Sequence, residues 1–281
     1  MFGVVVDPAS VDSWSRATDI WPDVCMDFEP WSNNRALSTQ LAETKAMGND
    51  TCMITWEPWK PCAQDDPGSY YQTGYSMESI LRGDHDDYID LFARALRDSG
   101  LPTIYLRFAH EMNGNWYPWS YDAGAYRDAW MYLRDRIRFS RKATNVKFVW
   151  SPNPDLWALP PRFLIRVLQY WPPERYVDYI GLTIIERDNT NYSIPDIATR
   201  VKLIHDVFGK DVIAAEVNCV LDKAEDWFNA LGDYIYRSHP FRALVLAQTG
   251  VRSGTTGLNW TIEDHPAECR AVRRLVNALH S

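Results

Sequence analysis

The 281-residue sequence has no run of about 18 apolar residues, the minimum for a membrane-spanning helix. It also has no long basic segment, and its formal net charge is −8. Nucleic acids and anionic lipid surfaces are bound by clustered positive charge. We therefore expect a protein that binds neither nucleic acid nor membrane, and we take a monomer as the default state.

No Cys-x-x-Cys pair occurs among the five cysteines, which are Cys25, Cys52, Cys62, Cys219 and Cys269. This scatter favours buried free thiols over a disulfide framework or a structural zinc site. The segment GDHDD (83–87) has metal-ligand residue types, but it precedes a helical pattern, so we predict that it caps that helix. A metal-dependent barrel hydrolase would place His-x-His after the first strand, where VVVDP stands. We expect no metal and no cofactor.

The opening segment MFGVVVD has no basic start and no long apolar stretch, so it is typical of a strand and not of an export signal. The sequence does not distinguish a cytoplasmic protein from a secreted one whose export signal is absent from this chain.

Aromatic residues are unusually abundant, at 14% of the chain, with 13 Trp and 15 Tyr. Part of this set would serve the core. The remainder suggests exposed rings, on which the C–H faces of sugars can stack while Asn, Asp, Glu, His and Arg bind the hydroxyl groups. The composition therefore points toward a carbohydrate ligand.

Eight short apolar runs alternate with helical patterns along the chain. Several runs are apolar on both faces, as parallel strands covered by helices should be. The predicted strands span residues 2–7, 24–29, 51–57, 103–109, 146–152, 176–184, 211–217 and 243–248. Four predicted helices are marked by their apolar residues. They contain Tyr126, Trp130, Leu133 and Ile137; Ile197, Val201 and Ile204, with Gly209 as the predicted end of the helix; Trp227, Leu231 and Ile235; and the segment 271–279.

Eight strand–helix units predict a single α/β domain over residues 1–281, a (β/α)8 TIM barrel. An open doubly wound sheet is the alternative, and the absence of a Gly-rich loop after the first strand disfavours it. The longest irregular stretch, residues 57–85, follows the third strand and would lie at the C-terminal rim, where loops of such barrels build substrate sites.

Polar residues recur where the apolar strands end. They are Asp7, Asp27, Glu29, Glu57, His110, Glu111, Asn153, Glu186, Asp188, Glu216, Asn218 and Gln248. Glu111 ends the fourth strand and Glu216 the seventh, and these strands lie across the mouth of a barrel from each other. Two carboxyl groups facing each other across a cleft are the working groups of glycoside hydrolysis. We expect one to attack the anomeric carbon and the other to act as acid and base.

The segment RFAHEMNGNWYPW (107–119) resembles the acid/base motif of glycoside hydrolase family 26, with its Arg-x-x-His-Glu-Met-Asn-Gly followed by aromatic residues. MITWEPW (53–59), YVDYIGL (176–182) and VIAAEVN (212–218) resemble the family's third, sixth and seventh strands, in the same order. The resemblance implies a retaining (β/α)8 glycosidase of clan A. Endo-β-1,4-mannanases are its best-known members, beside β-1,3-1,4-glucanases and enzymes acting on xylan.

The resemblance implies that Glu111 is the general acid/base and Glu216 the nucleophile. His110 would contact the sugar or the nucleophile, and Arg107 would steady the carboxylates. Further substrate contacts would come from Trp56, Glu57, Trp59, Asn113, Trp116, Trp119, Asn153, Glu186 and Trp260.

Two segments depart from the family pattern. After the sixth strand the family usually has a Gly-x-Asp-x-Tyr-like segment whose Tyr lies near the nucleophile, but this chain reads GLTIIERDN (181–189). The eighth strand ends in LAQTG (246–250), which contains no aromatic residue. Trp260 would supply the aromatic ring instead. The hydrogen-bond partner of the nucleophile is therefore open, and so is the sugar.

The sequence thus predicts a glycosidase with a polysaccharide or oligosaccharide as its binding partner. Mannan is the first candidate substrate, and mixed-linkage glucan, xylan and a bacterial exopolysaccharide are the alternatives. The sequence does not decide between endo and exo cleavage. The alternative function is a barrel that binds sugar without cleaving it, which the altered sixth strand suggests; a binding protein, however, would not need both Glu111 and Glu216.

Overall fold

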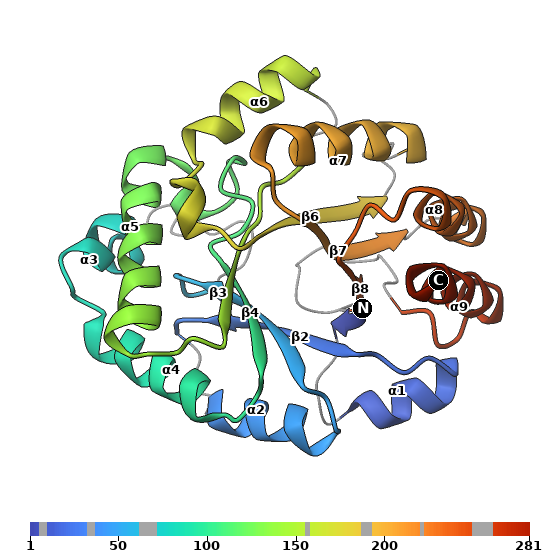
Figure 1. Ribbon diagram of the computed structural model, residues 1–281, viewed down its shortest axis with the longest axis horizontal. Helices are drawn as coiled ribbons and strands as arrows, with labels where there is room; N and C mark the ends of the chain where they lie inside the picture. Colours follow the sequence, from blue (N-terminus) through green and yellow to red (C-terminus); the bar gives the residue numbers. More distant parts are fainter. Residues whose placement is uncertain are drawn as a thin grey trace. The chain divides into compact units, whose positions relative to one another are not determined.

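All eight predicted strands are present in the computed structural model, which describes residues 1–5, 10–32, 37–61, 72–154, 158–186, 193–219, 222–248 and 261–281. They close in chain order into one barrel, and every strand pair with a described register is parallel (Figure 1). The predicted (β/α)8 barrel is confirmed. The strands are β1 Phe2–Val5, β2 Val24–Pro30, β3 Thr51–Glu57, β4 Thr103–Phe108, β5 Val146–Trp150, β6 Tyr179–Glu186, β7 Val212–Cys219 and β8 Ala243–Ala247.

Helices follow the strands along the chain, as the apolar periodicity predicts. They are α1 Val11–Thr18, α2 Leu37–Ala46, α3 Met77–Leu81, α4 Asp86–Asp98, α5 Ala123–Asp135, α6 Pro160–Gln169, α7 Ile194–Phe208, α8 Ala224–Ser238 and α9 Pro266–His280. A π-turn, Arg136–Ser140, extends α5 and carries Ile137. Gly209 ends α7 with a φ of 64°, a left-handed conformation that glycine adopts without steric cost. Within the described ranges, no helix is long and apolar enough to cross a membrane.

The chain divides into two compact units. The first comprises residues 1–26, 154–160 and 181–281, and in it α8 packs beside α9 (Figure 1). The second comprises residues 27–153 and 161–180 and contains β3, β4, β5 and the helices α2 to α5. The four described cysteines are buried and form no disulfide, as expected: Cys25, Cys52, Cys219 and Cys269; Cys62 lies outside the described residues.

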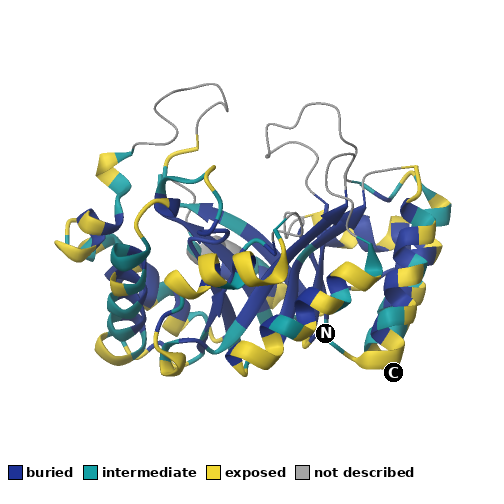
Figure 2. Ribbon diagram, turned by 90° about the horizontal axis from the view of Figure 1, so that it is seen from above, coloured by how far each residue is buried: buried dark blue, intermediate teal, exposed yellow. Residues whose placement is uncertain are grey.

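Alternation of side chains along β3 and β4 separates a polar face from an aromatic face. Thr55 is opposite Arg107 in the register, and these two side chains are within hydrogen-bonding distance. Trp56 and Phe108, one residue further on, point to the other face, where Trp56 stacks on Phe92 of α4 with a centroid distance of 4.3 Å. Both faces are buried, and the helices bury one side and expose the other (Figure 2).

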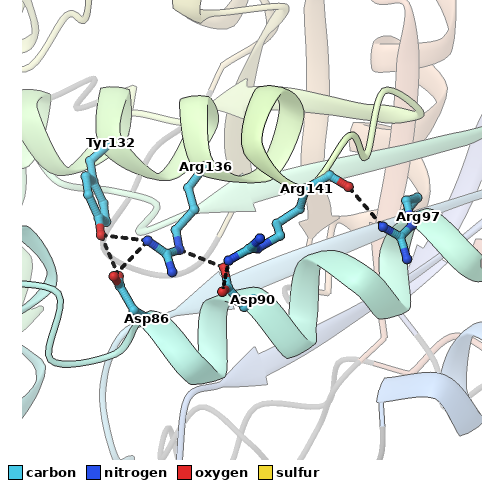
Figure 3. A network of polar contacts seen from close by, with 6 residues as sticks. All are labelled: Asp86, Asp90, Arg97, Tyr132, Arg136 and Arg141. Carbon is cyan, nitrogen blue, oxygen red and sulfur yellow. Dashed lines mark hydrogen bonds and ion pairs between the residues drawn. The ribbon is translucent and has the colours of Figure 1, made fainter.

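The helix predicted after GDHDD begins at Asp86, but the predicted capping is wrong in its detail. The N-cap residue is His85, and it makes no side-chain cap hydrogen bond. Asp86 instead accepts from Tyr132 of α5 and pairs with Arg136 at 2.7 Å. Asp90 pairs with Arg136 and also with Arg141 (Figure 3). These charges join α4 to the π-turn after α5 because both aspartates lie on the same face, four residues apart.

We expect Asp90→Asn to destabilise the protein by about 1 kcal/mol at pH 7, after allowance for solvent screening of the partly exposed arginines. Arg141, by hydrogen bonding, and Arg136 lower the pKa of Asp90 to about 2. A lowered pKa in the folded state stabilises the protein above the unfolded pKa of about 4, and this contribution is lost as the pH falls toward 2. Urea unfolding of both proteins at several pH values should show a difference that shrinks below pH 4.

The matched control is Asp233→Asn, which removes an exposed i, i+4 pair with Arg237. Exposed pairs contribute little, so its free energy of unfolding should change by less than about 0.5 kcal/mol. A difference between the Asp90→Asn variant and the unsubstituted protein that does not depend on pH would contradict the assigned role of this network.

Candidate active site

The backbone at the end of β4 turns sharply outward. Ala109 and Glu111 have φ values of 43° and 54°, a left-handed region that costs a residue with a Cβ on the order of 1 kcal/mol. Hydrogen bonds to both neighbouring strand ends hold this conformation: Ala109 N donates to Trp56 O at 3.0 Å, and Glu111 N donates to Ser151 O at 2.6 Å. The strained turn therefore fixes the position of His110 and Glu111.

Both carboxyl oxygens of Glu111 accept hydrogen bonds from N–H donors. Asn153 Nδ2 donates to Oε1 at 3.0 Å, and Trp116 Nε1 donates to Oε2 at 2.9 Å. Asn113 fixes Asn153 in turn, because it donates to Asn153 O at 2.9 Å and accepts from Asn153 N at 2.8 Å. Glu111 is 8% exposed. The two asparagines predicted to bind sugar thus lie beside Glu111 and orient its carboxyl group.

Trp116 lies directly against the backbone of Gly114. A methyl group added at Gly114 would lie 2.5 Å from a carbon of the indole six-membered ring, closer than atoms can approach. Glycine at this position therefore permits the contact and with it the bond from Trp116 to Glu111. The indole is 40% exposed, so one part of it faces solvent while its N–H holds the carboxylate.

Gly114→Ala is expected to displace the Trp116 ring and to break its hydrogen bond to Glu111. With Glu111 in the acid/base role that the sequence predicts, misplacement of its carboxyl group should lower kcat/KM by about 10- to 100-fold. Gly74→Ala is the control, because an added methyl there meets no atom within 4 Å. Equal kcat/KM for the two variants would show that the contact of Gly114 with Trp116 has no influence on Glu111.

Arg107 is fully buried on the polar face of β4. Its Nε donates to Ser151 Oγ at 2.8 Å, and its Nη1 lies 3.4 Å from Thr55 Oγ1. The guanidinium therefore joins β3, β4 and β5 at the level where the strands end. A steadying influence of Arg107 on the carboxylates stays a prediction.

His110 is buried, at 2% exposure. Its Nε2 lies 3.0 Å from the hydroxyl of Tyr117, and its Nδ1 lies 3.9 Å from Glu57 Oε1. Burial and the nearby Arg107 lower the pKa of His110 well below its usual range, so the ring is neutral. The contact with Glu57 is therefore not an ion pair.

The aromatic residues of this region divide between interior and surface. Tyr117 and Trp119 stack with a centroid distance of 4.4 Å, and Trp59 packs edge-on against both. Trp119 is buried and donates to His110 O, and Trp56 is fully buried and donates to the Tyr88 hydroxyl. Both rings are buried in this structure, and the substrate contacts expected of Trp56 and Trp119 stay predictions. Trp56 alternates with Thr55 and Glu57 and so points toward the helices.

Glu216 lies in the middle of β7 and is partly exposed, although its neighbours Ala215 and Val217 are fully buried. The β7–β8 register shifts between Ala214 and Val217, so the pairing is irregular around Ala215 and Glu216. Irregularities such as β-bulges re-aim side chains near functional sites. Thr183 Oγ1 of β6 lies 3.4 Å from Glu216 Oε1 and donates to it. The altered sixth strand therefore supplies a hydroxyl donor to the predicted nucleophile.

Glu186, on the opposite face of β6 from Thr183, is buried and forms an ion pair with Lys223 at 2.5 Å. A contact of Glu186 with substrate stays a prediction. At the end of β8, Gln248 Oε1 accepts from Trp14 Nε1 at 3.2 Å. Asp7, Asp188 and Trp260 lie outside the described residues. In the described part of the chain, no group of three or more His, Cys, Asp or Glu residues could hold a metal ion.

Sequence reasoning missed Gly114, Tyr117, Thr183 and Lys223. For Gly114 and Tyr117 a signal existed, because they stand in the same motif as Glu111. Thr183 and Lys223 carried none, because each is defined by a contact with a residue 33 or more positions away in the chain.

Comparison with known proteins gives several matches. Residues 70–234 match the model of glycosyl hydrolase family 26. Endoglucanase H of Acetivibrio thermocellus is 29% identical over 167 residues, which cover 57% of this chain and 16% of that protein. A β-1,3-xylanase of a Vibrio species is 25% identical over 191 residues, covering 66% of this chain and 38% of the xylanase. The chain thus spans well under half the length of either relative.

Among solved structures, the family 26 β-mannanase of Bacteroides ovatus has the same fold. It superposes with a TM-score of 0.74 at 16% identity, covering 98% of this chain and 87% of the mannanase. The family match extends over more than half of the present sequence and includes Glu111 with the motif around it. The chain belongs to glycosyl hydrolase family 26, a family of glycoside hydrolases.

Proposed function

We propose that this domain is a retaining endo-β-glycosidase, with Glu111 as general acid/base and Glu216 as nucleophile. The observation that carries the proposal is the support of Glu111: a strained turn fixes its backbone, and N–H groups of Asn153 and Trp116 orient its two carboxyl oxygens. A residue that only filled space would not need these two oriented donors. Glu216 fits the second role because it is partly exposed within an otherwise buried strand, beside a shift in the strand register, and because Thr183 donates to it.

The reaction would run in two steps. First, a carboxylate oxygen of Glu216 attacks the anomeric carbon while Glu111 gives its proton to the departing glycosidic oxygen, which leaves a covalent glycosyl-enzyme. Second, Glu111, now ionised, takes a proton from water, whose oxygen attacks the anomeric carbon and releases Glu216. The configuration is inverted twice and so retained.

Donors aimed at Glu111 have a specific consequence for this cycle. Trp and Asn N–H groups stabilise the ionised carboxyl group, which is the form needed in the second step. The first step needs the protonated form, so another influence must favour the proton before cleavage. In the retaining mechanism an ionised nucleophile supplies such an influence, since like charges raise proton affinity until the covalent bond neutralises one of them.

The substrate would be a β-linked polysaccharide or oligosaccharide, bound partly by the exposed ring of Trp116 and by Trp59. β-1,4-Mannan is the first candidate, since the structurally similar protein of Bacteroides ovatus is a β-mannanase. The named relatives also include an endoglucanase and a β-1,3-xylanase. Mixed-linkage β-glucan, xylan and bacterial exopolysaccharide therefore remain alternative substrates.

The test is reducing-sugar release from a panel of β-mannans, β-glucans, xylans and bacterial polysaccharides, with Glu216→Ala alongside. Release from one polymer that disappears in the variant would support both the activity and the nucleophile. Binding of a polymer without release would instead favour a sugar-binding barrel. Release that persists in the variant would refute the assignment of Glu216.

A further inference from the structure

We infer that Tyr117 is a positioning residue: its hydroxyl donates to His110 Nε2 and so holds in place an imidazole whose hydrogen lies on Nδ1. The inference about the tautomer rests on geometry alone. Its consequence for catalysis rests on the proposed function, because it concerns how the residue beside Glu111 is oriented.

Tyr117 is itself held in place by its neighbours. Trp119 stacks on its ring with an interplanar angle of 11°, and Trp59 packs edge-on at a centroid distance of 5.4 Å. The hydroxyl then reaches His110 Nε2 at 3.0 Å. Trp119 also donates to His110 O at 2.7 Å. The segment after β4 therefore contacts both the side chain and the backbone of His110.

The imidazole has only two neutral forms to choose from. If Nε2 carried the hydrogen, Tyr117 would accept, and the bare lone pair of Nδ1 would face Glu57 Oε1 at 3.9 Å. If Nδ1 carries the hydrogen, the N–H dipole points toward the carboxylate, and Nε2 accepts from Tyr117. Nδ1 is buried and has no hydrogen-bond partner among the described residues, so no donor there offsets the repulsion in the first form. Electrostatics therefore selects the second form.

The arrangement assigns separate tasks to the two residues. His110 is a neutral donor through Nδ1 and takes no part in proton transfer near pH 7. Tyr117 uses its hydroxyl hydrogen on His110. Since His110 stands between the two strained residues Ala109 and Glu111, a ring that rotated would loosen the turn that carries the acid/base carboxyl group. Tyr117 therefore acts on Glu111 through His110.

The test is a long-range ¹H–¹⁵N correlation spectrum of the histidine rings in the intact domain, with His110→Gln to assign the His110 signals. We expect a protonated Nδ1 and an unprotonated Nε2 for His110, and a changed ¹⁵N shift of Nε2 in Tyr117→Phe because the accepted hydrogen bond is lost. A protonated Nε2 in the unsubstituted protein would overturn the inference, as would an Nε2 shift in Tyr117→Phe equal to that of the unsubstituted protein.

Tyr121→Phe is the matched control, because Tyr121 stands in the same segment, is 54% exposed and donates to Asn115 O and not to His110. The His110 ring spectrum and the activity of the Tyr121→Phe variant should match those of the unsubstituted protein. Tyr117→Phe should lower kcat about tenfold and leave KM within about twofold, the pattern of lost positioning. A change in KM alone would refute the positioning role. The spectra do not depend on turnover, so they decide the inference even if no polysaccharide is cleaved.

Discussion

Replacing Glu216 by alanine should lower kcat/KM on the responsive polysaccharide by at least about 10⁴-fold, because no carboxylate remains to form the glycosyl-enzyme. The folded structure should survive, since Glu216 is only partly buried and lies beside a shift in the strand register. Added azide should restore part of the activity by entering the space of the missing carboxylate. The product would then be the α-glycosyl azide, because only one displacement occurs. Steady-state rates and NMR of the product measure both effects.

Glu225→Gln is the control for Glu216, because Glu225 pairs with Arg274 on the protein surface at 3.8 Å and takes no part in the proposed site. Its rate should equal that of the unsubstituted domain. If the Glu216→Ala variant kept a tenth or more of the activity, another group would have to be the nucleophile.

Glu111→Ala should show a loss that depends on the leaving group. On polysaccharide, whose leaving alcohol needs a proton, kcat/KM should fall by about 10²- to 10⁴-fold, the contribution of general acid catalysis. On an aryl glycoside with an acidic phenol the first step needs little protonation, so its rate should fall much less. Azide should then accelerate the second step and yield the β-glycosyl azide, because the nucleophile Glu216 is intact. Parallel kinetics on the two substrates measure the difference.

An equal loss on both kinds of substrate would contradict the role of Glu111 as acid/base. Asn153→Ala provides a graded comparison, because it removes the donor to Oε1 but leaves Trp116 on Oε2. We expect its rates to lie between those of the Glu111→Ala variant and the unsubstituted domain.

The barrel was predictable from the sequence because its strands are apolar on both faces and alternate with helical periodicity. The first and last residues of individual strands were harder to predict. The predicted sixth strand, 176–184, lies three residues early at its start, since Glu174–Tyr176 forms a 3₁₀ turn before β6 begins at Tyr179. Short apolar runs do not mark where hydrogen bonding to the next strand begins.

The two carboxylates of the candidate site could be proposed from the sequence, but the hydrogen bonds around them could not. Glu111 stands in a recognisable motif, but its bonds to Asn153 and to Trp116 depend on a strained turn. The orientation of Trp56 could have been deduced, because alternation places it opposite to Thr55 and Glu57. The donor Thr183 could not, because it contacts Glu216 only through the packing of β6 near β7.

The measurement that tests the central claim most directly is the ¹H NMR spectrum of the first product formed from the polysaccharide that the domain cleaves. Double displacement through a glycosyl-enzyme predicts that the β-anomer of the new reducing end forms first and then equilibrates with the α-anomer. If the α-anomer formed first, water would attack directly. Glu216 would then be a base instead of a nucleophile, and the proposed mechanism would be wrong.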